Sequence, residues 1–133
     1  MDANIYREQI IDLYENPLNH GELADPDFTY EEDNPLCGDV IRIDVVLDEQ
    51  KRVKEVAWRG DGCAISQAAA SLLTEEIKGK TLDEVKSFTS EELLALVGVP
   101  LSMARVKCAL LSLKVLKAGA YGIPDPDTIR KHE

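Results

Sequence analysis

The feature that most constrains the fold is an alternation of apolar side chains in residues 41–47. Every second position of this segment is aliphatic: Ile41, Ile43, Val45 and Leu47. A period of two is that of a β-strand with one face on a core. A polar turn at residues 48–51 and a second apolar run at residues 53–58 follow, which predicts an antiparallel hairpin. We expect Gly60-Asp61-Gly62 to end its second strand.

Helical spacing dominates the chain on both sides of this hairpin. Residues 4–15 repeat their apolar positions every three or four residues, and Pro17 stops the pattern. Residues 64–78 form a second predicted helix, and Gly79 suits its C-terminus. The apolar stripe of this second helix is Ile65, Ala68, Ala69, Leu72, Leu73 and Ile77.

Two short helices are predicted next from their starting residues. Thr81 with Glu84, and Thr89 with Glu92, have the spacing of a capping box, in which two side chains satisfy the first backbone N–H groups. Gly98 is expected to close the second of these helices.

A long final helix is predicted over residues 102–118, with Gly119 and Gly122 ending it. Residues 28–31 form a possible edge strand after a loop at residues 18–27. The order of elements is one helix, then strands, then four helices. Because the two types are segregated along the chain, we expect a single α+β domain spanning residues 1–133, with helices on one side of a small antiparallel sheet.

Composition excludes several functions. The net charge of −10 argues against nucleic acid, because phosphate backbones bind surfaces rich in lysine and arginine. No apolar run reaches the length of a membrane span, and charged residues interrupt the N-terminus, so we expect no membrane partner and a cytoplasmic protein. Only 5% of residues are aromatic, which predicts an aliphatic core around the single tryptophan, Trp58.

The three cysteines need an explanation of their own. An odd number does not suit a disulfide framework, and the cytosol keeps thiols reduced. Cys37 lies in a glycine-containing loop, Cys63 opens a predicted helix, and Cys108 lies in the second turn of the final helix. A lone cysteine is often a small buried hydrophobe, and this alternative is strongest for Cys108.

The surroundings of the cysteines favour metal or sulfur chemistry, because the thiolate is the form that binds metal. The positive end of a helix dipole favours an anion at Cys63. Arg105 and Lys107 bring cations beside the third cysteine, and a solvated helix face is the alternative interpretation of both. Gly38 and Gly62 leave room beside the sulfurs for a bulky ligand.

Asp39 is a candidate fourth ligand, two residues after Cys37. Three thiolates and one carboxylate suit tetrahedral zinc, and thiolates also hold iron–sulfur clusters. One oxygen ligand should make a cluster easier to release. The alternative is that Asp39 is an ordinary turn or capping residue. His20 and His132 have no ligand-like spacing to the cysteines, and we expect both in loops or on the surface.

Three segments resemble the cysteine motifs of the U-type iron–sulfur cluster scaffold family, which includes IscU, SufU and the N-terminal domain of NifU. They are Asn-Pro-Leu-Cys-Gly-Asp (residues 34–39), Gly-Asp-Gly-Cys-Ala-Ile-Ser (60–66) and Arg-Val-Lys-Cys-Ala-Leu-Leu (105–111). They occur in the family's order, and the resemblance covers nearly the whole chain.

This resemblance implies a three-stranded sheet with about five helices and a scaffold function. It implies that Cys37, Asp39, Cys63 and Cys108 bind a transient 2Fe–2S cluster, or zinc in the cluster-free form. It also implies a cysteine desulfurase as sulfur donor, acceptor apoproteins, and chaperones in some systems. Such a protein is a carrier rather than an ordinary enzyme.

Two departures leave the main role open. Lys107 stands where the IscU branch has histidine, which resembles SufU, yet the chain lacks the insertion that SufU proteins carry between the second and third cysteines. The alternatives are a cluster scaffold and a zinc-dependent sulfurtransferase, with Cys37 or Cys108 as the persulfide acceptor. A third possibility is an α+β interaction module whose cysteines are merely buried.

Overall fold

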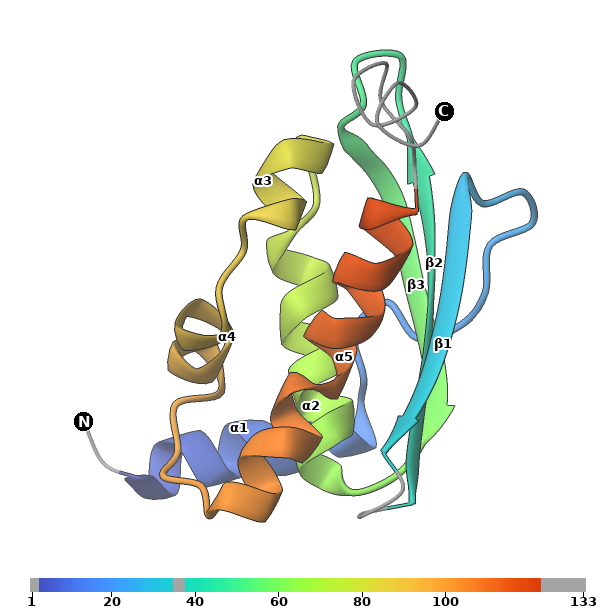
Figure 1. Cartoon of the computed structure of the whole chain (residues 1–133). Helices are drawn as coiled ribbons and strands as arrows, with labels where there is room; N and C mark the ends of the chain where they lie inside the picture. The colour runs from blue at the N-terminus through green and yellow to red at the C-terminus, as the bar shows by residue number, and fades with distance from the viewer. Residues whose placement is uncertain (1–2, 35–37, 123–133) are drawn as a thin grey trace.

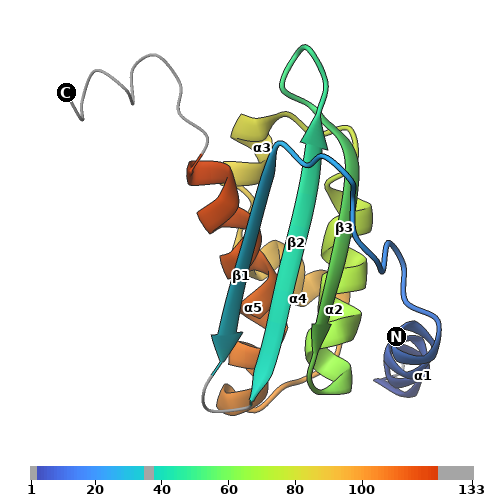
Figure 2. The same ribbon diagram turned by 90° about the vertical axis from the view of Figure 1, so that its right-hand side faces the viewer.

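The computed structural model describes residues 3–34 and 38–122, and its organising element is a three-stranded antiparallel sheet. The strands are β1 (Phe28–Asn34), β2 (Asp39–Leu47) and β3 (Val53–Asp61), in the order β1-β2-β3. Figure 2 shows the sheet face-on, with the helices behind it. The predicted hairpin is therefore β2 and β3, and the predicted edge strand is β1.

The alternation in β2 has the predicted consequence, since Ile41, Ile43 and Val45 are each at most 1% exposed. The strands nevertheless run a few residues beyond the predicted apolar segments, and β3 ends at Asp61, inside the Gly60-Asp61-Gly62 segment that was expected to end it. A Cβ atom on Gly60 would overlap the backbone carbonyl of Val40 on β2. Gly60 thus allows the two strands to stay close, and their pairing continues to Asp61.

Five helices cover one face of the sheet in this part of the chain: α1 (Ala3–Glu15), α2 (Ala64–Glu76), α3 (Leu82–Lys86), α4 (Ser90–Val97) and α5 (Met103–Tyr121). Figure 1 shows α2 and α5 next to the sheet, with α1 and α4 further out. The starts of β2, α2 and α5 meet at one end of the molecule, at the bottom of Figure 1. The α+β single-domain prediction is confirmed. No helix among residues 3–34 and 38–122 is long and apolar enough to cross a membrane.

The core is aliphatic, as predicted, and lies between the sheet and the helices. Trp58 is its largest member, fully buried, and its indole N–H donates to the backbone carbonyl of Leu18 at 2.8 Å. The face of α2 is less apolar than the predicted stripe. Three hydroxyl side chains of this helix are also fully buried: Ser66, Ser71 and Thr74.

Both capping boxes are present. Thr81 and Glu84 start α3, and Thr89 and Glu92 start α4, each pair with the two reciprocal hydrogen bonds. Gly98 ends α4 with a left-handed φ of 75°, and Gly79 follows α2 with a φ of 82°.

The expectation that Gly119 ends the final helix was wrong. Gly119 lies inside α5, which continues to Tyr121. A Cβ atom on Gly119 would come within 2.7 Å of the ring atom Cε1 of Phe28 on β1. The glycine therefore serves close packing of the helix on the strand rather than helix termination.

Candidate metal centre

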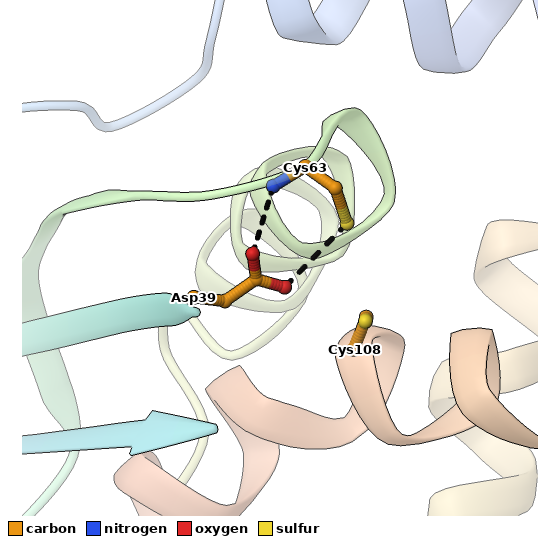
Figure 3. A group of neighbouring side chains, drawn as sticks. All are labelled: Asp39, Cys63 and Cys108. Atoms are coloured by element: carbon orange, nitrogen blue, oxygen red, sulfur yellow. Dashed lines mark hydrogen bonds between the residues drawn. The ribbon is translucent and has the colours of Figure 1, made fainter. Parts of the chain in front are cut away.

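Three predicted ligand residues from three different elements converge at the end of the molecule where β2, α2 and α5 begin. They are Asp39 at the start of β2, Cys63 just before α2, and Cys108 in the second turn of α5. One carboxylate oxygen and the two Sγ atoms all lie within 4.8 Å of one another. Figure 3 shows both sulfurs turned toward the carboxylate. Cys37, the fourth predicted ligand, lies outside the described residues.

The Asp39 side chain is held in place by Cys63. Its Oδ1 atom accepts a hydrogen bond from the Cys63 backbone N–H at 3.0 Å, and its Oδ2 atom accepts one from the Cys63 thiol at 3.5 Å. Asp39 is only 1% exposed, so these contacts satisfy a carboxylate that would otherwise be buried without partners. The capping and ligand interpretations of Asp39 are therefore compatible, because one oxygen caps α2 while the other faces the sulfurs.

Gly62 allows the Asp39 carboxylate to lie this close to Cys63. A Cβ atom at this position would come within 2.6 Å of the Asp39 carboxyl carbon. The space that we expected Gly62 to leave for a bulky ligand is thus occupied by Asp39 itself. Gly38 acts differently, because a Cβ there would meet nothing within 4 Å, whereas its φ of 71° lies in the left-handed region that favours glycine.

Cys108 is completely buried, as the packing alternative predicts. Its sulfur nevertheless belongs to the same group of donor atoms as Asp39 and Cys63. Burial and a place at the site are both true of this residue. A buried thiol that faces a second thiol and a carboxylate has a polar environment on one side, which packing alone does not require.

Arg105 and Lys107 lie on different sides of α5. Arg105 lines a hollow of about 440 Å³ together with Cys63, and Arg7 from α1 lines the same hollow. The rest of its lining is mostly apolar and includes Ile10, Ile11, Ile65 and Val99. Lys107 instead lines a separate hollow of about 260 Å³ between α5 and β1. Of the two predicted supporting cations, Arg105 is thus the one that shares a hollow with a candidate ligand.

Sequence reasoning missed two residues at this end of the molecule. Arg7 carried no signal, because nothing in the pattern of residues 4–15 indicates that α1 lies beside Cys63. Ser66 had a weak signal, since a residue three places after Cys63 is its neighbour on a helix. Its buried hydroxyl donates to the Cys63 carbonyl at 3.0 Å and lies 3.8 Å from the Cys63 sulfur.

The histidines are not part of this group in the described chain. His20 is exposed in the loop after α1, in agreement with the prediction, and its ring centroid lies 4.9 Å from that of Trp58 in a T-shaped arrangement. His132 lies outside the described residues.

The donor set fits zinc or iron. Ligand atoms around a tetrahedral zinc ion bound by sulfur and oxygen lie about 3.5–3.8 Å apart. The thiol of Cys63 is already 3.5 Å from Asp39, and all three atoms lie within 4.8 Å, so small side-chain rotations would complete that spacing. Three donors leave one position of a tetrahedron for a fourth ligand.

Known proteins that are similar to this chain agree with the family that its cysteine motifs resemble. Residues 5–125 match the family model described as NifU-like N terminal domain. The zinc-dependent sulfurtransferase SufU of Bacillus subtilis is 37% identical, with 86% of this chain and 88% of the relative covered. The iron–sulfur cluster assembly scaffold protein IscU of Azotobacter vinelandii is 34% identical, with 85% and 89% covered.

A solved structure extends this likeness to three dimensions. The crystal structure of a protein described as an iron–sulfur cluster assembly scaffold for the SUF system, from Fervidobacterium islandicum, has a TM-score of 0.74 and 28% identity. The match covers 90% of this chain and 99% of that chain. Sequence motifs, site geometry and these matches agree, and the chain belongs to the NifU-like N-terminal domain family.

Proposed function

We propose that this protein is a scaffold on which an iron–sulfur cluster is assembled and then passed to acceptor apoproteins. The observation that carries the proposal is the convergence of Asp39, Cys63 and Cys108 from three elements. Cys37 is proposed as the fourth ligand, because it is separated from Asp39 by a single residue in the chain. The whole chain, residues 1–133, would act as one scaffold domain for this cargo.

The residues of the site have distinct tasks in this function. Cys63 and Cys108 each give up a thiol proton and bind iron as thiolates. When the Cys63 thiol proton leaves, Asp39 Oδ2 loses its hydrogen-bond donor and turns to the metal as an oxygen ligand. Asp39 Oδ1 keeps its bond to the Cys63 backbone N–H, so the carboxylate stays oriented during loading.

The oxygen ligand also suits release. Iron–sulfur clusters prefer thiolates, so an incoming acceptor thiolate displaces a carboxylate more readily than a sulfur ligand. The protein therefore loads and unloads cargo instead of turning over a substrate. Its sulfur would come from a cysteine desulfurase, with chaperones as further partners in delivery. Because every step needs reduced thiols, we place the protein in the cytoplasm.

A zinc-dependent sulfurtransferase is the second candidate function, and the SufU relative favours it. In that role zinc occupies the same donors, and one thiol accepts a persulfide sulfur. Cys108 is fully buried in this conformation, which supports Cys37 over Cys108 as the acceptor. The alignment with SufU spans 132 positions although 86% of this chain takes part, so the relative carries residues that this chain lacks.

Anaerobic reconstitution with ferrous iron, cysteine, a cysteine desulfurase and a thiol reductant that converts persulfide sulfur to sulfide tests the proposal. The scaffold function predicts cluster absorbance with stoichiometric iron and sulfide, and transfer of that cluster to an acceptor apoprotein. Tightly bound zinc with a persulfide and no cluster would instead establish the sulfurtransferase. An interaction module with merely buried cysteines predicts neither, and in that case zinc would not protect Cys63 from alkylation.

A further inference from the structure

The inference concerns Ser66, the third residue of α2, which is fully buried beneath Cys63. Its hydroxyl oxygen lies between two groups of Cys63. The hydroxyl donates to the Cys63 backbone carbonyl at 3.0 Å, and the hydroxyl oxygen lies 3.8 Å from the Cys63 sulfur, whose proton is directed to Asp39. Ser66 is therefore in contact with a proposed ligand without being a ligand.

The helix itself does not need this hydroxyl. The Cys63 carbonyl already accepts the regular helical bond from the Gln67 backbone N–H at 3.2 Å. Serine is a weaker helix former than alanine, because its hydroxyl competes for backbone groups. Three buried positions that follow in the same helix are alanines: Ala68, Ala69 and Ala70. Alanine would suit position 66 equally well if packing were its only purpose.

Metal binding changes what the Cys63 sulfur requires. A thiol donates one hydrogen bond, whereas a metal-bound thiolate has no proton and only accepts. Two polar side chains among the described residues lie within hydrogen-bonding distance of this sulfur, Asp39 at 3.5 Å and Ser66 at 3.8 Å. A carboxylate can only accept, but a hydroxyl can donate. In the loaded site, Ser66 is thus the member of this pair that can satisfy the sulfur.

We propose that Ser66 is a positioning residue that turns its hydroxyl proton from the Cys63 carbonyl to the Cys63 sulfur when metal binds. The inference rests on the proposed function, because it requires Cys63 to be a ligand. The hydrogen bond disperses negative charge on the sulfur and stabilises a site that gathers several anionic ligands around one metal. Hydrogen bonds of this kind around metal ligands typically change metal affinity about 10- to 100-fold.

Cobalt binding provides the test, because Co²⁺ takes tetrahedral thiolate sites and its sulfur-to-metal charge-transfer band reports the electron density on the sulfur. We compare the wild-type chain with Ser66→Ala and Ser66→Gly, both of which delete the hydroxyl. Both variants should bind Co²⁺ about tenfold more weakly, in competition with a chelator, and should move the band to longer wavelength. The two variants differ in helix propensity, so a purely structural effect would separate them, whereas the band shift should be the same in both.

Ser71→Ala is the matched control. Ser71 is a buried serine of the same helix, and its hydroxyl oxygen accepts a hydrogen bond from the Leu18 backbone N–H at 3.1 Å. Its removal should lower stability and leave the cobalt band of the wild type in place. An unchanged band and affinity in both Ser66 variants would overturn the inference while leaving the proposed function intact. A wild-type chain with no thiolate charge-transfer band would overturn both.

Discussion

Helices α2 and α4 satisfy the backbone N–H groups at their starts in different ways, one with a distant residue and the other with residues of its own first turn. At α4, the Thr89 hydroxyl accepts a hydrogen bond from the Glu92 backbone N–H, and the Glu92 carboxylate accepts one from the Thr89 backbone N–H. The cap is therefore complete within four residues. At α2, the N-cap residue is Cys63, just before the helix, and its side chain makes no capping bond. Its backbone N–H is satisfied by Asp39, 24 residues earlier on β2.

The difference shows how a ligand group can be built into the start of a helix. A local cap needs only its own turn, and it forms wherever the sequence places the right pair. The α2 cap depends on the pairing of β2 with β3, because that pairing brings the start of β2 beside the residues that precede α2. The same contact that completes the helix therefore orients the carboxylate toward both sulfurs. Four substitutions test this comparison, in order of expected effect.

Asp39→Ala should have the largest effect, because it removes the cap and a proposed ligand together. We expect the free energy of unfolding of the metal-free protein to fall by about 2 kcal/mol, measured by urea denaturation. Transfer of a bound cluster to an acceptor should also slow, because the displaceable oxygen ligand is gone. Asp39→Asn keeps an oxygen for the Cys63 N–H and should recover most of the stability. Equal losses in the two variants, or an unchanged transfer rate, would contradict this view.

Gly62→Ala should come next, because the added methyl group would overlap the Asp39 carboxyl group. We expect a loss of about 1–2 kcal/mol in unfolding free energy together with weaker zinc binding, measured by competition with a chelator. Gly38→Ala is the control, since it strains the backbone at about 1 kcal/mol but meets no atom. If both variants bind zinc equally well, the space at Gly62 does not serve Asp39.

Thr89→Ala removes the local cap of α4 and should cost about 1 kcal/mol of unfolding free energy. Zinc affinity and cluster transfer should not change, because α4 carries no proposed ligand. This variant separates loss of a cap from loss of a site. A drop in metal affinity comparable to that of Gly62→Ala would show that the two helix starts are coupled.

The smallest effect is expected at Glu84, in the capping box of α3. Hydrogen bonds from the Thr81 backbone and side chain hold the pKa of Glu84 below its ordinary value of 4.5. A carboxyl group with a lowered pKa stabilises the folded state above pH 4.5, and this contribution is lost as the pH falls below that value. Glu84→Gln should therefore flatten the acid side of the stability profile slightly, measured by thermal unfolding between pH 6 and pH 3. If stability falls equally steeply with pH in the variant and the wild type, the ionised Glu84 carboxylate does not contribute to the stability of the capping box.

The parts of this molecule that sequence could predict are those with local causes. The capping pairs at Thr81 and Thr89 lie within one turn, and the alternation in residues 41–47 has a period set by the strand itself. Asp39, Cys63 and Cys108, the candidate ligands that converge in the fold, were also singled out in advance, because glycines, a helix start and the family motifs mark them.

What sequence could not predict depends on contacts between distant segments. The reason for Gly62 is the Asp39 carboxylate, and the reason for Gly119 is the Phe28 ring, neither of which is near in the chain. Glycine is a common sign of a helix end, so Gly119 was assigned that role, whereas Gly62 was expected to leave room for a bulky ligand. Ser66 looked like any helical serine until its distance to the Cys63 sulfur was known.

The contact between Gly119 and Phe28 has a consequence for the far end of its helix. Gly119 lies eleven positions after Cys108 in α5, which is a length of roughly 16 Å at 1.5 Å per residue. Because α5 is one continuous helix, a change in its tilt where Gly119 packs on β1 also moves the Cys108 sulfur near its other end. A tilt of about 4° at Gly119 would move Cys108 by about 1 Å over such a length. A methyl group added at position 119 would push α5 away from the Phe28 ring and shift the Cys108 sulfur without contacting the candidate metal site.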